Sequence, residues 1–182
     1  MGIKVEEIGL GVKIITPDKF CDYRGYYSEI FSIRTLKENG IDFNVVQDNE
    51  AYCLKKGTVR GIHFQNNPKA QAKILRCTKG KVFDVAVDLR KDSRTYKKYV
   101  SVILEENDGK FIFIPKGFGH ICVSLVDNSI INYKVNELYC PTLDRGIRFN
   151  DPEINILYPI NDFVVSEKDK IAPLLKESDV NF

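Results

Sequence analysis

Hydrophobic and polar residues alternate with a period of two along much of the chain. In the segment 82–89, VFDVAVDL, every second residue is Phe, Val or Leu, and two aspartates lie between them. This is the pattern of a strand with one face in a hydrophobic core. Short runs rich in β-branched and aromatic residues recur at 4–17, 26–33, 44–54, 58–64, 72–78, 97–105, 110–115, 120–126 and 129–135. Turn-forming sequences separate these runs, which predicts an all-β antiparallel sandwich or barrel.

Helix signals are few and peripheral. The segment 33–40 predicts a short helix that ends with Gly40 in a left-handed cap, and the segment 166–177 predicts one that begins after Ser166 as N-cap. The proline-containing stretch after Pro141 is expected to be irregular coil packed over the β core. Because no linker or internal repeat interrupts the chain, residues 1–182 are expected to form a single domain.

Composition and charge narrow the class of protein. With 43% hydrophobic and 29% charged residues, the 182-residue chain has the composition of an ordinary soluble globular protein. Its net charge is only +2, which argues against nucleic acid or an anionic membrane as the main partner. No apolar run reaches the ~18 residues of a membrane span, and the amino terminus does not resemble a signal peptide. We therefore expect a cytoplasmic protein.

The five cysteines, an odd number, are widely spaced and include no CxxC pair. Neither a disulfide framework nor a zinc knuckle is indicated, and mostly buried free thiols in a reducing compartment are expected.

The two histidines, His63 and His120, are the first candidates for chemistry. Neither belongs to an HxH pair, which a jelly-roll metal site uses because residues i and i+2 point to the same side of a strand. A two-histidine site completed by carboxylates is the less favoured alternative. His63 shares strand parity with Gln65, whereas Ile62 and Phe64 take the other face. Taken alone, this segment favours a core histidine whose ring nitrogens are hydrogen-bonded within the protein over a catalytic histidine.

Other polar residues could join His63 in one cavity. Arg60 would point away from His63 in a regular strand, but Gly61 between them could permit a bulge that brings both to one side. Lys73 opens a neighbouring strand and could face the same cavity or solvent. The parity of Tyr133 directs its ring into the core or a cleft, where a buried tyrosine normally finds a hydrogen-bond partner.

Two further groups of residues remain ambiguous from local pattern. Asp169 follows Ser166 by three residues, which is a capping-box variant as well as a possible catalytic carboxylate. The run FCDYRGYYSEIF places Arg24 and Glu29 beside aromatic residues, as either an ordinary edge hairpin or the rim of an anion site.

Taken in order, these segments resemble the dTDP-4-dehydrorhamnose 3,5-epimerase family over nearly the full chain. The resemblance is carried by FCDYRGYYSEIF, VVQDN, the block from KKGTVRGIHFQ to VFDVAVDLRKDSRTYKKY, IFIPKGFGH, YKVNELYCP, DRGIRFNDPEINI and SEKDKIAPLL. It implies a cupin-type jelly roll without metal or redox cofactor, and a homodimer in which amino-terminal strands cross to the partner subunit.

The resemblance also implies a mechanism. In a nucleoside-diphosphate 4-keto-6-deoxyhexose, carbons 3 and 5 flank the C4 ketone, so either can lose a proton to give an enolate. His63 resembles the general base, Asp169 the carboxylate that pairs with it, and Tyr133 the proton donor on the opposite face. Lys73 and His120 match groups that hold the sugar and stabilise the enolate oxygen.

Nucleotide-binding positions are implied as well. Arg24 and Arg60 match residues suited to the diphosphate, and Tyr139 matches one that stacks on the base. Further substrate contacts are implied at Glu29, Gln47, Asp48, Asn49, Asp144 and Lys168. Arg24 and Glu29 are expected to act in the neighbouring subunit's site.

The sequence departs from the family pattern at several positions. Ile121 and Cys122 follow His120 where Gly and Phe are usual, Phe149 stands where a Trp is usual, and Asp144 replaces a longer Glu. The leading interpretation is a C3 and C5 epimerase that forms the L-rhamnose precursor. The alternatives are a C3-only epimerase of another deoxysugar, a non-catalytic sugar-binding jelly roll and, least favoured, a metal-dependent cupin oxygenase.

Overall fold

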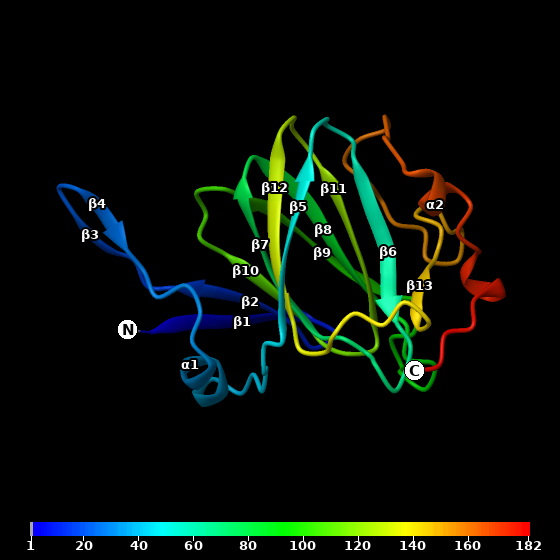
Figure 1. Ribbon diagram of the computed structural model, residues 1–182, viewed down its shortest axis with the longest axis horizontal. Coiled ribbons are helices and arrows are strands. Elements are labelled where there is room, and N and C mark those ends of the chain that lie inside the picture. Colours follow the sequence, from blue (N-terminus) through cyan, green and yellow to red (C-terminus); the bar gives the residue numbers. More distant parts are fainter. Residues whose placement is uncertain (1) are drawn as a thin grey trace.

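The computed structural model describes residues 2–182, which form two antiparallel sheets and a separate hairpin (Figure 1). The first sheet has the order β1 (Ile3–Gly9), β2 (Val12–Pro17), β10 (Phe111–Ile114), β7 (Lys73–Lys79), β12 (Ser129–Val135), β5 (Gln47–Cys53). The second has the order β13 (Asp144–Gly146), β6 (Val59–Gln65), β11 (Phe118–Ser124), β8 (Lys81–Asp88), β9 (Tyr99–Glu105). The prediction of an all-β, cupin-type antiparallel jelly roll is confirmed.

The hairpin of β3 (Phe20–Asp22) and β4 (Gly25–Tyr27) projects away from the two sheets (Figure 1). The expected strand at 26–33 is wrong beyond Tyr27, because the chain continues irregularly and then enters helix α1 (Ile33–Glu38). The Ser32 hydroxyl caps this helix by accepting the N–H of Thr35 at 3.3 Å.

The two expected helices are present but short. Gly40 follows α1 with a φ of +74°, as the predicted left-handed cap requires. Helix α2 (Glu167–Lys170) begins after Ser166, as predicted. It does not continue to residue 177. Pro173 lacks an N–H for helical hydrogen bonding, and only a 3₁₀ turn, Leu175–Glu177, follows it.

Apolar side chains form three layers rather than one. One layer lies between the sheets and includes Leu75, Leu104, Ile112 and Ile131. A second covers the outer face of the six-stranded sheet, where α1 packs. The third lies on the outer face of the five-stranded sheet, against the irregular carboxyl-terminal segment (orange to red in Figure 1). The predicted packing of this segment over the β core is confirmed.

This third layer corrects one expectation about β8. The alternation at 82–89 predicted a strand with one buried face, yet every residue from 82 to 88 is buried. The Phe and Val residues at odd positions pack under the carboxyl-terminal segment, while Val82 and Ala86 pack between the sheets. The aspartates of this strand are therefore buried too.

Asp88, at the end of β8, holds the following loop through hydrogen bonds to both of its carboxylate oxygens. It accepts hydrogen bonds from the backbone N–H and side chain of Arg90 and from the hydroxyls of Ser93 and Thr95, at 2.7–3.0 Å. Burial alone would raise the pKa of Asp88, but these donors outweigh it and lower the pKa to about 2.

Strand β6 contains the bulge that the sequence suggested. His63 pairs with His120 and Arg60 pairs with Cys122 of β11, so the four residues 60–63 of β6 lie opposite the three residues 120–122 of β11. The extra residue lets Arg60 and His63 face the same cavity. Gly61 adopts a φ of +130°, and a Cβ there would lie 2.4 Å from the carbonyl oxygen of His120. Only glycine fits this position.

Two more expectations concern the cysteines and the membrane. All five cysteines are free, with Cys53, Cys77 and Cys122 buried, Cys140 partly exposed and Cys21 exposed. Over residues 2–182, none of the helices has the length and apolar character needed to cross a membrane.

We expect Gly61→Ala to lower the free energy of unfolding by at least ~2 kcal/mol more than Gly25→Ala, measured by urea unfolding. Both glycines have a φ of +130°, but a Cβ at Gly25 meets nothing within 4 Å. The control therefore carries the backbone strain without the overlap with β11. Equal losses in the two variants would contradict the proposed tightness of the bulge.

Candidate active site

A cavity of about 460 Å³ opens between the two sheets, within the size range typical of ligand sites. Its walls come from β5, β7 and β12 of one sheet, β6 and β11 of the other, and the segment leading into α2. Both sheets and this segment contribute polar side chains to the lining, which includes Arg60, His63, Lys73, His120, Tyr133, Lys168 and Asp169.

The half-buried His63 and the buried Asp169 form a pair within this cavity. The Nε2 of His63 lies 2.6 Å from the Oδ1 of Asp169. Burial would raise the pKa of Asp169, but the hydrogen bond and charge of His63 lead to a net lowering. An ionised carboxylate can only accept, so Nε2 carries the proton and Nδ1 of the neutral ring keeps its lone pair. In this arrangement Nδ1 is the ring nitrogen of His63 that can accept a proton.

Asp169 also resolves the ambiguity about capping. Its backbone N–H donates to the Ser166 hydroxyl at 3.2 Å, while its side chain turns to His63. Ser166 thus caps α2, but Asp169 does not return the reciprocal contact of a capping box. The cap instead fixes the carboxylate at the cavity wall.

A second histidine–carboxylate pair lies beside the first. The Nε2 of His120, which pairs with His63 across the sheet, lies 2.8 Å from Oδ2 of the fully buried Asp84. No donor within residues 2–182 reaches the other oxygen, Oδ1. Asp84 was not among the expected site residues. The sequence feature that could have indicated Asp84 is its place as an acidic residue in the middle of an otherwise apolar strand.

Lys73 brings a buried amine to the cavity from β7, with 9% of the residue exposed. Burial lowers its pKa, and the negative charges of Asp84 and Asp144 partly oppose that shift. The sequence pattern left open whether Lys73 faces the cavity or solvent, and the structure places it in the cavity wall.

Tyr133 reaches the cavity from the sheet opposite His63. Its ring packs into the layer between the sheets, as its strand parity predicted. Burial raises the pKa of its hydroxyl, despite the opposing charge of Arg60. The phenol is therefore held in its protonated, donating form at neutral pH.

Arg60 and Cys122 form another part of the wall. The Nη2 of Arg60 donates to the carbonyl of Tyr52 at 2.7 Å and its Nε lies 3.4 Å from Sγ of Cys53. Burial raises the pKa of the Cys122 thiol well above its usual range. Cys122 thus offers a neutral, compact surface next to a fixed guanidinium.

A polar rim surrounds the entrance. Asp144 accepts from Nζ of Lys168 at 2.8 Å and lies 3.4 Å from the hydroxyl of Tyr139. Gln47 accepts the N–H of Tyr139 at 3.1 Å, and Asn49 donates to the carbonyl of Tyr133 at 3.3 Å. Of the expected nucleotide-contact residues, Lys168 therefore lines the cavity, and a continuous chain of contacts joins it to Asp144, Tyr139, Gln47 and Asn49.

The chemistry of the two histidines does not match a metal centre. Within the part of the chain that the structure describes, no three His, Cys, Asp or Glu side chains converge in a way that could hold an ion. Each histidine instead directs Nε2 at a carboxylate.

The sequence is similar to that of known proteins over most of its length. Residues 9–177 match the sequence profile of dTDP-4-dehydrorhamnose 3,5-epimerases. The chain is 46% identical to the dTDP-4-dehydrorhamnose 3,5-epimerase of Sinorhizobium fredii over 172 residues, which cover 94% of this chain and 88% of that protein. The chain belongs to the dTDP-4-dehydrorhamnose 3,5-epimerase family.

Solved structures of epimerases share the fold. The Bacillus anthracis dTDP-4-dehydrorhamnose 3,5-epimerase, solved with TDP and PPi bound, matches with a TM-score of 0.92 and 40% identity, over 95% of this chain and 99% of that one. The Legionella pneumophila dTDP-6-deoxy-D-glucose-3,5-epimerase, in complex with dTDP-4-keto-L-rhamnose, matches with a TM-score of 0.91 and 35% identity, over 97% and 95% of the two chains.

Three residues expected in the epimerase site lie elsewhere in this subunit. Arg24 is on the projecting hairpin, where it pairs with Asp22. Glu29 lies near the start of α1 and accepts from the Thr35 hydroxyl at 3.3 Å. Asp48 pairs with Lys134 at the other face of the six-stranded sheet from Tyr133. The sequence already indicated this position for Asp48, because Asp48 alternates with Gln47 and Asn49 along the strand and therefore lies on the opposite face.

We expect Asp84→Asn to lower the pKa of Lys73 further, because the Asp84 charge favours the protonated amine. The titration can be followed by NMR of protein labelled with ¹³C at the lysine ε-carbon. Asp88→Asn is the matched control, since Asp88 is an equally buried aspartate of the same strand whose charge does not contribute to the Lys73 shift. An unchanged or raised midpoint in Asp84→Asn would contradict this coupling.

Proposed function

We propose that this protein epimerises C3 and C5 of a nucleoside-diphosphate 4-keto-6-deoxyhexose, converting dTDP-4-dehydro-6-deoxyglucose to dTDP-4-dehydro-L-rhamnose. One observation carries the proposal: His63 with Asp169 on one side and Tyr133 on the facing sheet line the same cavity. A sugar held between them meets a base on one face and a proton donor on the other, which inversion at carbon requires. The names and bound ligands of the relatives support the same substrate class.

The proton transfers follow from the residues present. A C–H bond next to the C4 ketone loses its proton to Nδ1 of His63, and the electron pair moves to O4 as an enolate. Asp169 stabilises the imidazolium that forms. Tyr133 then donates its proton to the opposite face of the same carbon, so the configuration inverts. Solvent exchange must restore the protonation states of both groups before the second carbon reacts.

Lys73 and His120 supply stabilisation for the enolate oxygen. Both lie in the cavity wall, and each is influenced by the buried charge of Asp84. Donors fixed in a site that excludes water stabilise a developing oxyanion more strongly than they would in water. The chain's own side chains can therefore carry the reaction.

The diphosphate and the base occupy the outer part of the cavity in this proposal. Arg60 offers a forked donor whose position is already fixed by the carbonyl of Tyr52. Tyr139 offers an aromatic face for the nucleoside base, and Lys168 offers a further cation. Asp144 links these last two residues at the rim.

We further propose that a single domain spanning residues 1–182 assembles as a homodimer, with the amino-terminal strands exchanged between subunits. The hairpin of β3 and β4 supports this. It projects away from the two sheets (Figure 1), its Arg24 is not among the residues that line the cavity, and its Phe20, Tyr26 and Tyr27 are at least half exposed. Aromatic groups of this size are usually covered by a partner surface. Arg24 and Glu29 would then complete the neighbouring site.

The reaction can be followed by proton NMR of dTDP-4-keto-6-deoxyglucose in heavy water. We expect the wild-type protein to introduce deuterium at C3 and C5, and a downstream reductase to trap the product as the rhamnose nucleotide. His63→Ala should abolish exchange at both carbons, because one base serves both. Tyr133→Phe should retain part of the proton loss while the completed inversion falls by about 10²-fold or more.

The alternatives give different patterns in this experiment. Exchange at C3 alone in the wild-type protein would indicate a C3-only epimerase. Binding without exchange at either carbon would indicate a sugar-binding jelly roll. Retained turnover in His63→Ala would overturn the assignment of the base.

Strand exchange predicts complementation between two inactive variants. In a heterodimer of Arg24→Ala with His63→Ala, one site combines an intact His63 with an intact Arg24 from the partner. Random co-assembly should therefore recover about a quarter of wild-type turnover. Co-expressed, separately tagged subunits purified through both tags should recover about half. Activity no higher than that of either variant alone would contradict the exchange.

A further inference from the structure

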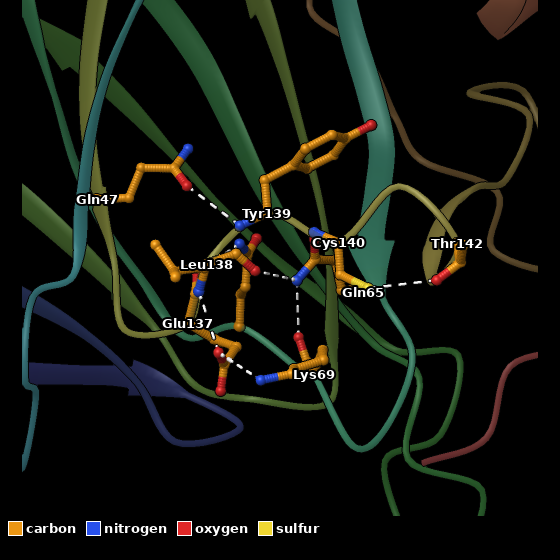
Figure 2. Close-up of polar contacts among 9 residues, drawn as sticks. Gln47, Gln65, Lys69, Glu137, Leu138, Tyr139, Cys140 and Thr142 are labelled. Atoms are coloured by element: carbon orange, nitrogen blue, oxygen red, sulfur yellow. Dashed lines mark hydrogen bonds and ion pairs between the residues drawn. The ribbon is translucent and has the colours of Figure 1, made fainter.

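The connection between β12 and β13 forms part of the rim but has little backbone pairing of its own. It includes the stretch from Glu137 to Thr142 and carries Tyr139, whose hydroxyl lies 3.4 Å from Asp144, the ion-pair partner of the cavity residue Lys168. Backbone N–H groups in such a segment need other acceptors. Figure 2 shows that glutamine side chains supply them: Gln47 accepts from the N–H of Tyr139 at 3.1 Å and Gln65 accepts from that of Cys140 at 2.6 Å.

Gln65 is the more deeply placed of the two, with 2% of the residue exposed. Its Nε2 donates to the carbonyl of Lys69 at 2.8 Å and to that of Leu138 at 3.2 Å. Together with the bond from Cys140, both ends of its amide group are engaged. This one side chain therefore joins the turn after β6 to the backbone on both sides of Tyr139.

The placement of Gln65 along β6 connects this loop to the catalytic pair. Gln65 follows His63 by two residues and lies directly opposite Asp144 of β13. The ring of Tyr139 projects away from the glutamine contacts (Figure 2), and its hydroxyl is directed toward Asp144. Strand β6 thus carries His63 and, through Gln65, also helps to hold the segment that bears Tyr139.

We propose that Gln65 is a positioning residue for the nucleoside subsite, which holds Tyr139 where it can stack on the base of the substrate. Gln65 acts through the backbone at Leu138 and Cys140, with no contact of its own to substrate. This inference rests on the proposed function, since it takes Tyr139 as the residue that stacks on the nucleoside base of the substrate. It predicts that loss of the Gln65 amide weakens nucleotide binding while the proton transfers continue.

Calorimetry with dTDP tests this in the full-length protein. Gln65→Met keeps the length and burial of the side chain but removes its hydrogen bonds. We expect about tenfold weaker dTDP binding, a similar rise in KM for the 4-keto sugar, and kcat within about twofold of wild type. Tyr139→Ala should cause a loss of similar size. The double variant should bind no more weakly than Tyr139→Ala alone, because Gln65 acts through Tyr139.

Asn66→Leu is the matched control. Asn66 is the adjacent residue, equally buried at 3% exposed, and its amide holds Asp179 and Asn181 of the carboxyl-terminal segment instead of the rim loop. It should lower Tm without changing dTDP affinity. If Gln65→Met does not fold, Gln65→Glu provides a second route. Its protonated form keeps an acceptor and a donor, so its dTDP affinity should recover as the pH falls.

Wild-type dTDP affinity in Gln65→Met, or losses that multiply in the double variant, would overturn the inference. A pH-independent affinity in Gln65→Glu would overturn it as well. These outcomes differ from a failure of the proposed function, which would be dTDP binding by the wild-type protein without isotope exchange in the sugar. In that case the affinities still decide whether Gln65 positions Tyr139.

Discussion

The five-stranded sheet carries apolar side chains on both faces, on the inner one beside the polar cavity wall, and the rest of the molecule is organised by the need to cover them. Facing strands of the other sheet cover one side, and the irregular carboxyl-terminal segment covers the other with Ile154, Leu175 and Val180. Covering that outer face brings α2 over the edge of β6. Asp169 consequently reaches His63 although 106 residues separate them in sequence. Hydrophobic burial, which is not directional, thus places a highly directional hydrogen bond.

Local deviations from regular strand geometry then adjust which side chains face the cavity. The bulge at Gly61 gives Arg60 and His63 a common direction while Ile62 between them stays in the outer apolar layer. The helix cap at Ser166 has the same effect for Asp169. In both places one neighbouring residue, Gly61 or Ser166, sets a local backbone geometry that determines where the polar group points.

Much of this arrangement was predictable from residue patterns. Strand parity correctly separated His63 from Ile62 and Phe64 and directed Tyr133 inward, because alternation is a local property of the chain. The second buried face of β8 was not predictable in the same way. Whether the face with Asp84 and Asp88 meets solvent depends on the strands of the other sheet that pack against it, which come from distant parts of the sequence. The end of the strand expected at 26–33 was mispredicted for a related reason, since within residues 2–182 no strand pairs with the residues after Tyr27.

Asp84 and Asp88 lie on the same face of one strand, yet their carboxylates differ in how many hydrogen bonds they accept. Asp88 receives hydrogen bonds from three side chains and a backbone amide, whereas Asp84 has His120 alone and an oxygen that no donor reaches within residues 2–182. A protein interior selected only for stability would complete both shells, because an unpaired buried acceptor carries a desolvation penalty. The contrast marks local frustration: β8 is fully relaxed where it turns into its loop and under-satisfied where it borders the cavity.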